Sequence, residues 1–75
     1  MKTYDVQFYN HNFSNVIWYR SETRNMFAVC ARYGRYNAGD EITVWAGNRI
    51  AWRAVYSPEK RDYIRVNVDP MERRL

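Results

Sequence analysis

The sequence predicts a single small α+β domain in the order ββαβββ, with a mainly antiparallel sheet and one amphipathic helix on one face. Five segments alternate apolar and polar residues with period two, one central segment has a helical period, and turn-forming residues separate them. A chain of 75 residues has room for one core. We therefore expect residues 1–75 to form one domain, with 70–75 as a short charged tail.

The first two strands are expected to form a hairpin. Residues 4–9 alternate with period two, and 16–20 are β-branched or aromatic, as is typical of strands. The polar, turn-rich segment 10–15 lies between them. The residues that the alternation of the first strand directs to a core are Tyr4, Val6 and Phe8.

A helix is predicted over residues 22–36. Ser21 can serve as its N-cap, and Glu22 places a negative charge in the first turn, where the helix dipole favours it. A broad apolar face is formed by Met26, Phe27, Val29, Cys30 and Tyr33, and the opposite arc carries Arg24, Arg32 and Arg35. Glycines that follow the apolar positions predict that the helix ends between Tyr33 and Asn37.

Three further strands follow, over residues 42–46, 49–56 and 63–68. Gly47-Asn48 predicts a tight hairpin turn between the first two of them, and Pro70 ends the last. A sheet with one helix leaves its second face uncovered. That open face is where we expect a binding surface.

Alternation predicts which side chains the open face carries. If the third and fifth strands bury Ile42, Val44, Ile64 and Val66, then Trp45, Tyr63 and Arg65 emerge together on the opposite face. The fourth strand has two possible registers, because a strict two-residue turn would expose Trp52 and Tyr56, whereas one extra residue or a bulge would bury both and expose Arg53. We prefer the second register because it buries the larger apolar set and keeps an arginine out of the core.

The charge pattern favours recognition of another macromolecule. The formal net charge is +4, and ten of the 12 cationic residues are Arg, which grips carboxylates or phosphates in a planar fork and stacks on aromatic rings. The candidate binding residues on the open face are Trp45, Arg49, Arg53, Tyr63 and Arg65. Trp, Tyr and Arg are the residues enriched in protein–protein hot spots, which favours a partner protein. The alternative is RNA or single-stranded DNA, with bases stacked on Trp45 and Tyr63. A secondary candidate surface is the basic helix face of Arg24, Arg32 and Arg35, although a solvated polar side of an amphipathic helix is the commonest explanation of such a face.

Residues for catalysis or metal binding are scarce. His11 is the only histidine and lies in the turn-rich segment 10–15, so we expect no Ser-His-acid triad and no histidine-based metal site. Cys30 is the only cysteine, so no intramolecular disulfide can form. We expect no enzymatic activity and no cofactor or metal. One enzyme class remains compatible with the composition, namely metal-free RNA cleavage by a basic cluster.

The sequence also bears on location and assembly. A lone cysteine is typical of a reducing, cytoplasmic setting, and neither a secretory signal nor a membrane-spanning segment is evident. We expect no membrane partner. An aromatic open face on so small a domain further predicts a monomer or a weak homodimer.

A hairpin, one helix and further strands, in a Tyr- and Trp-rich chain of 75 residues, resemble the small host-takeover and anti-defence proteins encoded by tailed phages. The resemblance concerns layout and size and includes no motif. It implies a stand-alone inhibitor that occupies the surface of a host protein. The basic charge departs from the acidic nucleic-acid mimics of that group, which argues against DNA mimicry.

Overall fold

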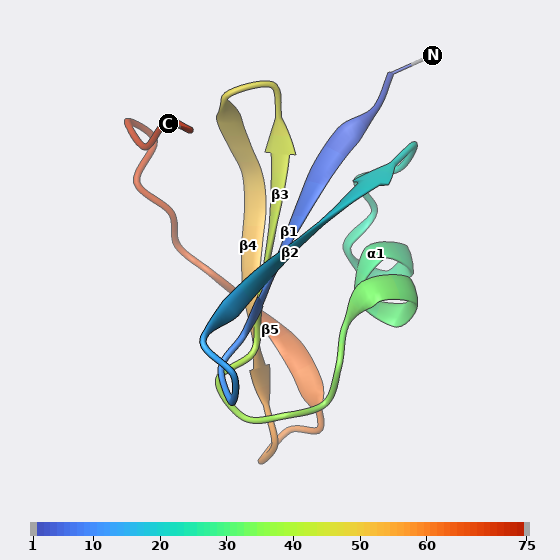
Figure 1. The fold of residues 1–75 in the computed structure, drawn as a ribbon, viewed down its shortest axis with the longest axis vertical. Coiled ribbons are helices and arrows are strands. Elements are labelled where there is room, and N and C mark those ends of the chain that lie inside the picture. Colours follow the sequence, from blue (N-terminus) through green and yellow to red (C-terminus); the bar gives the residue numbers. More distant parts are fainter. Residues whose placement is uncertain (1, 75) are drawn as a thin grey trace.

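The chain begins with a hairpin of β1 (Tyr4–Asn10) and β2 (Asn15–Ser21) in the computed structural model, which describes residues 2–74 (Figure 1). Side chains of β1 alternate between buried and half-buried, as the sequence predicts. In the turn, the Asn10 side-chain oxygen accepts a hydrogen bond from the Asn12 N–H at 3.1 Å, and Ser14 adopts a positive φ of 51°. The predicted first hairpin is confirmed.

The helix α1 (Met26–Tyr33) is shorter than predicted and begins four residues later. Ser21 is not its N-cap, because Ser21 ends β2 and exchanges hydrogen bonds with the backbone of Thr23. Asn25 caps the helix instead, with its side-chain oxygen accepting from the Ala28 N–H at 3.0 Å. The helix ends before Gly34, within the predicted interval. None of the helices in residues 2–74 is long and apolar enough to cross a membrane.

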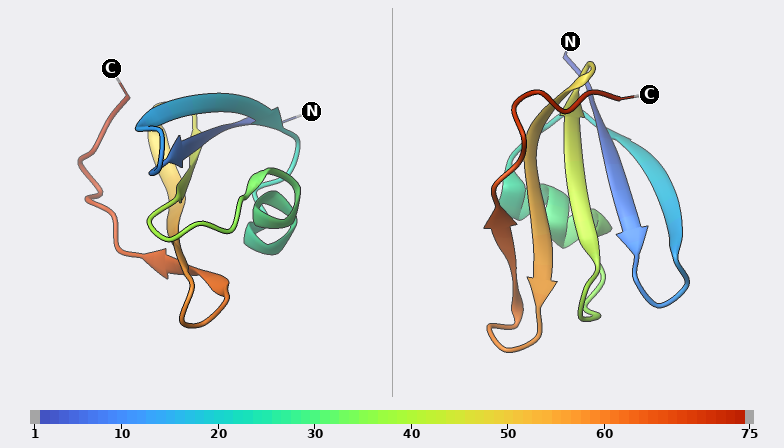
Figure 2. Two further views of the ribbon diagram at one scale, coloured as in Figure 1. Left: turned by 60° about the horizontal axis from the view of Figure 1, so that its bottom comes forward. Right: turned by 90° about the vertical axis from the view of Figure 1, so that its left-hand side faces the viewer.

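Three strands complete the sheet: β3 (Glu41–Ala46), β4 (Arg49–Ser57) and β5 (Asp62–Val66). Every pairing is antiparallel, and the strand order is β2-β1-β3-β4-β5. The helix covers one face (Figures 1 and 2). The predicted α+β class and the order ββαβββ are confirmed. The sheet has two edges, β2 and β5.

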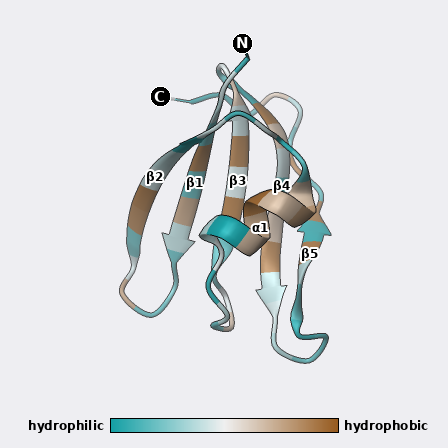
Figure 3. Cartoon of the chain, turned by 90° about the vertical axis from the view of Figure 1, so that its right-hand side faces the viewer, coloured by the Kyte–Doolittle hydropathy of each residue, from teal (hydrophilic) through white to brown (hydrophobic). Residues whose placement is uncertain are grey.

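The core lies between α1 and the sheet, where apolar positions of β1, β3 and β4 face the helix (Figure 3). Its most buried side chains are Val6, Phe8, Val29, Ile42 and Val44. Two side-chain hydrogen bonds hold this two-turn helix and the loop before it in place. The Tyr33 hydroxyl donates to the Arg20 carbonyl at 3.1 Å, and the Trp52 indole donates to the Arg24 carbonyl at 2.7 Å.

The register of β4 follows the preferred alternative. Val44 lies opposite Trp52, but Trp45 lies opposite Ile50, so Ala51 is the extra residue of a β-bulge. The bulge restores the inward phase for Trp52 and Tyr56, which are buried. The Arg53 side chain therefore points to the opposite face, where it donates a hydrogen bond to the Thr43 hydroxyl.

The phase predicted for β5 is wrong. Tyr63 lies opposite Tyr56 on the helix face and is only 4% exposed, whereas Ile64 points to the other face and is 38% exposed. The strand also ends at Val66 and not at Val68. On an edge strand, a large ring with a hydroxyl partner covers more of the core than a branched aliphatic side chain, and this outweighs the local apolar pattern.

Candidate functional site

The predicted open-face residues do not form one surface. Trp45 and Arg53 lie on the open face, but Tyr63 belongs to the core on the helix side. Arg65 shares the phase of Tyr63 and borders a hollow beside the start of α1. Arg49 is exposed next to the β3–β4 turn, opposite Ala46. The expected convergence of Trp45, Tyr63 and Arg65 is therefore wrong.

The open face is also partly covered by the segment that follows β5. Figure 2 (right) shows this segment running beside β4 and then across the end of the sheet. Its Arg74 forms an ion pair with Asp5 and lies over the rings of Trp18 and Trp45, at 4.8 and 6.0 Å from their centroids. Trp45 is left 4% exposed, and its indole N–H donates to the Gln7 side chain at 2.8 Å. Arg74 of the predicted tail 70–75 thus lies against the sheet, while residue 75 is outside the described part of the chain.

The cations of the open face are matched by acids of the same molecule. Arg53 pairs with Glu72 at 2.9 Å, and Asp5 pairs with both Arg20 and Arg74. The hydrogen bond from Arg74 holds the pKa of the Asp5 carboxyl below its usual value. A face whose charges are already neutralised has little to offer a phosphate backbone.

The predicted basic helix face is dispersed. Only Arg32 lies on α1, while Arg24 precedes the helix and Arg35 follows it. All three are exposed, and none forms an ion pair with another of residues 2–74. Arg65 is exposed and lacks such a pair as well. These four arginines therefore remain available to a partner.

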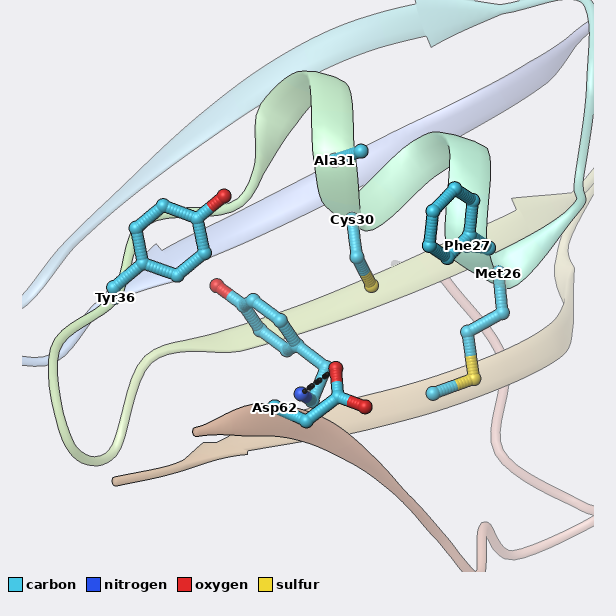
Figure 4. A pocket seen from close by; sticks show the side chains of 7 residues that line it. Met26, Phe27, Cys30, Ala31, Tyr36 and Asp62 are labelled. Atoms are coloured by element: carbon cyan, nitrogen blue, oxygen red, sulfur yellow. Dashed lines mark hydrogen bonds between the residues drawn. The ribbon is translucent and has the colours of Figure 1, made fainter. Parts of the chain in front are cut away.

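An apolar hollow of about 460 Å³ lies between α1 and β5 (Figure 4). We call it the α1–β5 groove; its apolar lining consists of Met26, Phe27, Cys30, Ala31, Tyr36 and Tyr63. Phe27 is 84% exposed and Tyr36 is 69% exposed, and they stand at opposite ends of the groove in Figure 4. Phe27, although part of the predicted apolar helix face, does not belong to the core, because Val29 and Cys30 fill the inward side of α1.

Tyr63 forms a rigid part of the groove. Its hydroxyl donates to the Arg35 carbonyl at 2.7 Å and accepts from the Arg35 N–H at 3.1 Å. Its ring packs edge-on against Tyr56, which in turn packs edge-on against Tyr36. Gly34 allows the end of α1 to approach Tyr63 this closely, because a Cβ at residue 34 would lie 2.5 Å from the Cys30 carbonyl oxygen and 2.7 Å from the Tyr63 ring. The groove is therefore preformed.

The Cys30 thiol and the Tyr63 hydroxyl, which both line the groove, are held in their protonated forms. Burial, together with the nearby charge of Asp62, raises the pKa of the Cys30 thiol to about 11, so the thiol is protonated and a poor nucleophile at neutral pH. Burial also raises the pKa of the Tyr63 hydroxyl. Among residues 2–74, no three His, Cys, Asp or Glu side chains are grouped as metal ligands would be. His11, in the first turn, is exposed.

A second, polar hollow adjoins the groove at the start of α1. Met26 lines both, and the remaining lining of the second hollow comprises Thr23, Arg24, Asn25, Ala51, Trp52 and Arg65. One end of the apolar groove is therefore bordered by two arginines from different elements. Arg35, whose backbone is hydrogen-bonded to the Tyr63 hydroxyl, is a third exposed arginine and directly precedes Tyr36.

Sequence reasoning did not find this groove. A helical wheel over 22–36 treats segments outside α1 as helix, so it joins three arginines into one face. It also counts Phe27 in the apolar face, although Phe27 lies about 100° from Met26, at the flank of that face. The signal that could have pointed to the groove is the succession Phe27, Ala28 and Ala31, because two small residues beside an aromatic one leave little to cover it. Comparison with protein-family models, curated proteins and solved structures gives no significant match.

Proposed function

We propose that this protein is a non-enzymatic inhibitor or adaptor that occupies the surface of a partner protein, with the α1–β5 groove as its docking site. The observation that carries the proposal is the exposure of Phe27 and Tyr36 at the two ends of an apolar, preformed hollow. Exposed aromatic residues around a hollow, with arginines at the rim, have the composition and shape of an interaction hot spot. The resemblance to phage proteins adds that the partner is a host factor.

The nucleic-acid alternative has less support. Trp45 and Tyr63, the two rings expected to stack on bases, are both buried, and they lie on opposite faces of the sheet. The acids paired with Arg53 and Arg74 reduce the positive potential of the open face. A partner protein fits the apolar groove better, because phosphate contacts need exposed cations more than they need apolar area.

A photo-crosslinking experiment tests this proposal. Phe27 is replaced by p-benzoylphenylalanine, and Asn48, exposed in the β3–β4 turn, receives the same residue as a control. We expect position 27 to give a discrete adduct that protease removes and nuclease does not, and position 48 to give none. The adduct should persist between about 50 and 200 mM salt, a range in which binding through several phosphate contacts is lost. A nuclease-sensitive adduct, or equal labelling at both positions, contradicts the proposal.

Two exposed phenylalanines provide a matched pair of variants. Phe27→Ser should abolish partner binding without loss of folding, because the side chain is 84% exposed. Phe13→Ser removes a side chain that is 77% exposed in the β1–β2 turn, and should leave binding unchanged. Equal affinity of the two variants would show that the groove is not the docking site.

A further inference from the structure

The edge of the sheet beside the groove is formed by β5. The strand order ends at β5, which pairs with β4 on one side and with no other strand of residues 2–74. Figure 4 shows the groove between α1 and this strand. An edge strand presents unpaired N–H and C=O groups to any extended chain that approaches it.

Two hydrogen bonds establish which backbone groups of β5 point outward. The Tyr56 N–H donates to the Asp40 carbonyl at 2.9 Å, on the β3 side of β4, so Tyr56 and the opposite Tyr63 form a non-hydrogen-bonded pair. In agreement, the Tyr63 N–H donates to the Asp62 side chain at 2.8 Å. Alternation then turns the N–H and C=O groups of both Tyr63 and Arg65 away from β4.

The residues with outward backbone groups are the same ones whose side chains face the groove. Tyr63 lines the groove, and Arg65 lines the adjoining hollow. A chain that bonded to β5 would lie about 4.8 Å away and would point every second side chain toward the helix side. Because α1 has eight residues, it is about 12 Å long, which matches two such side chains about 6.8 Å apart.

On this basis we infer that the partner supplies an extended segment that adds to the sheet as a sixth strand beside β5, with two alternate apolar side chains in the α1–β5 groove and acidic residues at either end. This inference rests on the proposed function and specifies its mode of recognition. Main-chain bonds supply affinity and the side-chain pockets supply selectivity in such strand addition.

The acidic flanks follow from charge complementarity. Arg24 and Arg65 line the hollow at one end of the groove, Arg35 directly precedes Tyr36 at the other, and none of the three forms an ion pair with another of residues 2–74. A second copy of this chain fits less well as the occupant, because each copy carries a net charge of +4. In the free protein the Asp62 carboxylate accepts a hydrogen bond from the Tyr63 N–H, so it competes with an added strand for that donor.

The probe that tests the inference is a synthetic peptide with blocked ends, in which valine, threonine and isoleucine are flanked by two acidic residues on each side. A control peptide of the same composition places valine and isoleucine next to each other, so that in a strand they point to opposite faces. In an NMR titration we expect the first peptide to bind at least tenfold more tightly and to protect the Arg65 amide from hydrogen exchange. Equal binding of the two peptides overturns the inference.

The decisive variants are Arg65→Pro and Arg65→Ala. Both remove the charge, but only proline removes the outward N–H, which the free fold does not use, so both should fold. We expect Arg65→Ala to weaken peptide binding several-fold and Arg65→Pro to weaken it at least tenfold more. Asp62→Ala should tighten binding by a few-fold because it frees the Tyr63 N–H. A folded Arg65→Pro protein that binds like Arg65→Ala, or an Asp62→Ala protein that does not bind more tightly, contradicts strand addition.

The two proposals fail in distinguishable ways. If Phe27→Ser abolishes binding of the partner that the crosslinking identifies, while Arg65→Pro still binds it, the groove is a docking site but no strand is added to β5. If neither variant alters partner binding, both proposals are wrong. Sedimentation that shows a dimer of the wild type, lost in Arg65→Pro, would make a second copy the occupant of the edge and overturn the acidic segment.

Discussion

The Tyr63 hydroxyl connects the edge strand to the segment after the helix, and its removal should destabilise the protein markedly. It donates to the Arg35 carbonyl at 2.7 Å and accepts from the Arg35 N–H at 3.1 Å, while the ring is 4% exposed. Tyr63→Phe deletes both hydrogen bonds and leaves two backbone groups without a protein partner in a part-buried position. Each hydrogen bond contributes about 1 kcal/mol net, so we expect the free energy of unfolding to fall by about 2 kcal/mol.

Urea unfolding followed by circular dichroism measures this loss directly. For a domain of this size, about 2 kcal/mol corresponds to a decrease in Tm of about 8 to 16 °C. Tyr36→Phe is the matched control, because Tyr36 is 69% exposed and its hydroxyl makes no hydrogen bond within residues 2–74. That variant should change stability by less than about 0.5 kcal/mol.

The outcome discriminates between the two phases of β5. If Tyr63 pointed to the open face, as the apolar pattern of residues 63–68 indicates, removal of its hydroxyl would be nearly neutral. A Tyr63→Phe protein that unfolds at the same urea concentration as the wild type would therefore refute the placement of Tyr63 in the core and, with it, the geometry of the groove.

Three further predictions concern the helix, the covered face and pH. Val29→Ala should lower the free energy of unfolding by roughly 2 to 3 kcal/mol, whereas Phe27→Ala should be nearly neutral in the same urea titration, since Val29 is 1% and Phe27 84% exposed. Arg74→Ala should shift tryptophan fluorescence to longer wavelength, because the guanidinium covers Trp45; an unchanged spectrum would contradict that cover. Stability should fall as the pH rises from 9 toward 11, because burial raises the folded-state pKa of Cys30 from 9.0 to about 11, so the folded state keeps a proton that the unfolded state releases. Cys30→Ala should show a smaller loss over that range in urea titrations at each pH.

Most of the fold is determined locally and could therefore be predicted. The period-two pattern in β1, with Val6 and Phe8 inward, survives unchanged because this strand is central and one of its faces is wholly buried. The bulge in β4 could also be predicted, because a register without it would expose Trp52 and bury Arg53. In both elements the pattern of large apolar side chains leaves a single favourable arrangement.

The candidate site was harder to predict from the sequence, because it depends on where short elements end. The N-cap is Asn25 and not Ser21, so Arg24 and Arg35 lie outside α1, and Phe27 lies at the flank of the inward side that Val29 and Cys30 fill. The cover over Trp45 comes from Arg74, which is 29 residues further along the chain, and no local pattern encodes that contact.

The sequence by itself determined the class of fold, the order of its elements and the inward phase of β1, β3 and β4, because these depend on residue type and short-range periodicity. Only the tertiary structure decided which face is available. On edge strand β5, burial of Tyr63 is decided by its hydrogen bonds to Arg35 and its contact with Tyr56, which come from distant parts of the chain. Likewise, acids elsewhere in the chain pair with Arg53 and Arg74 of the sheet face, and the fold leaves Phe27 and Tyr36 exposed at the ends of the α1–β5 groove.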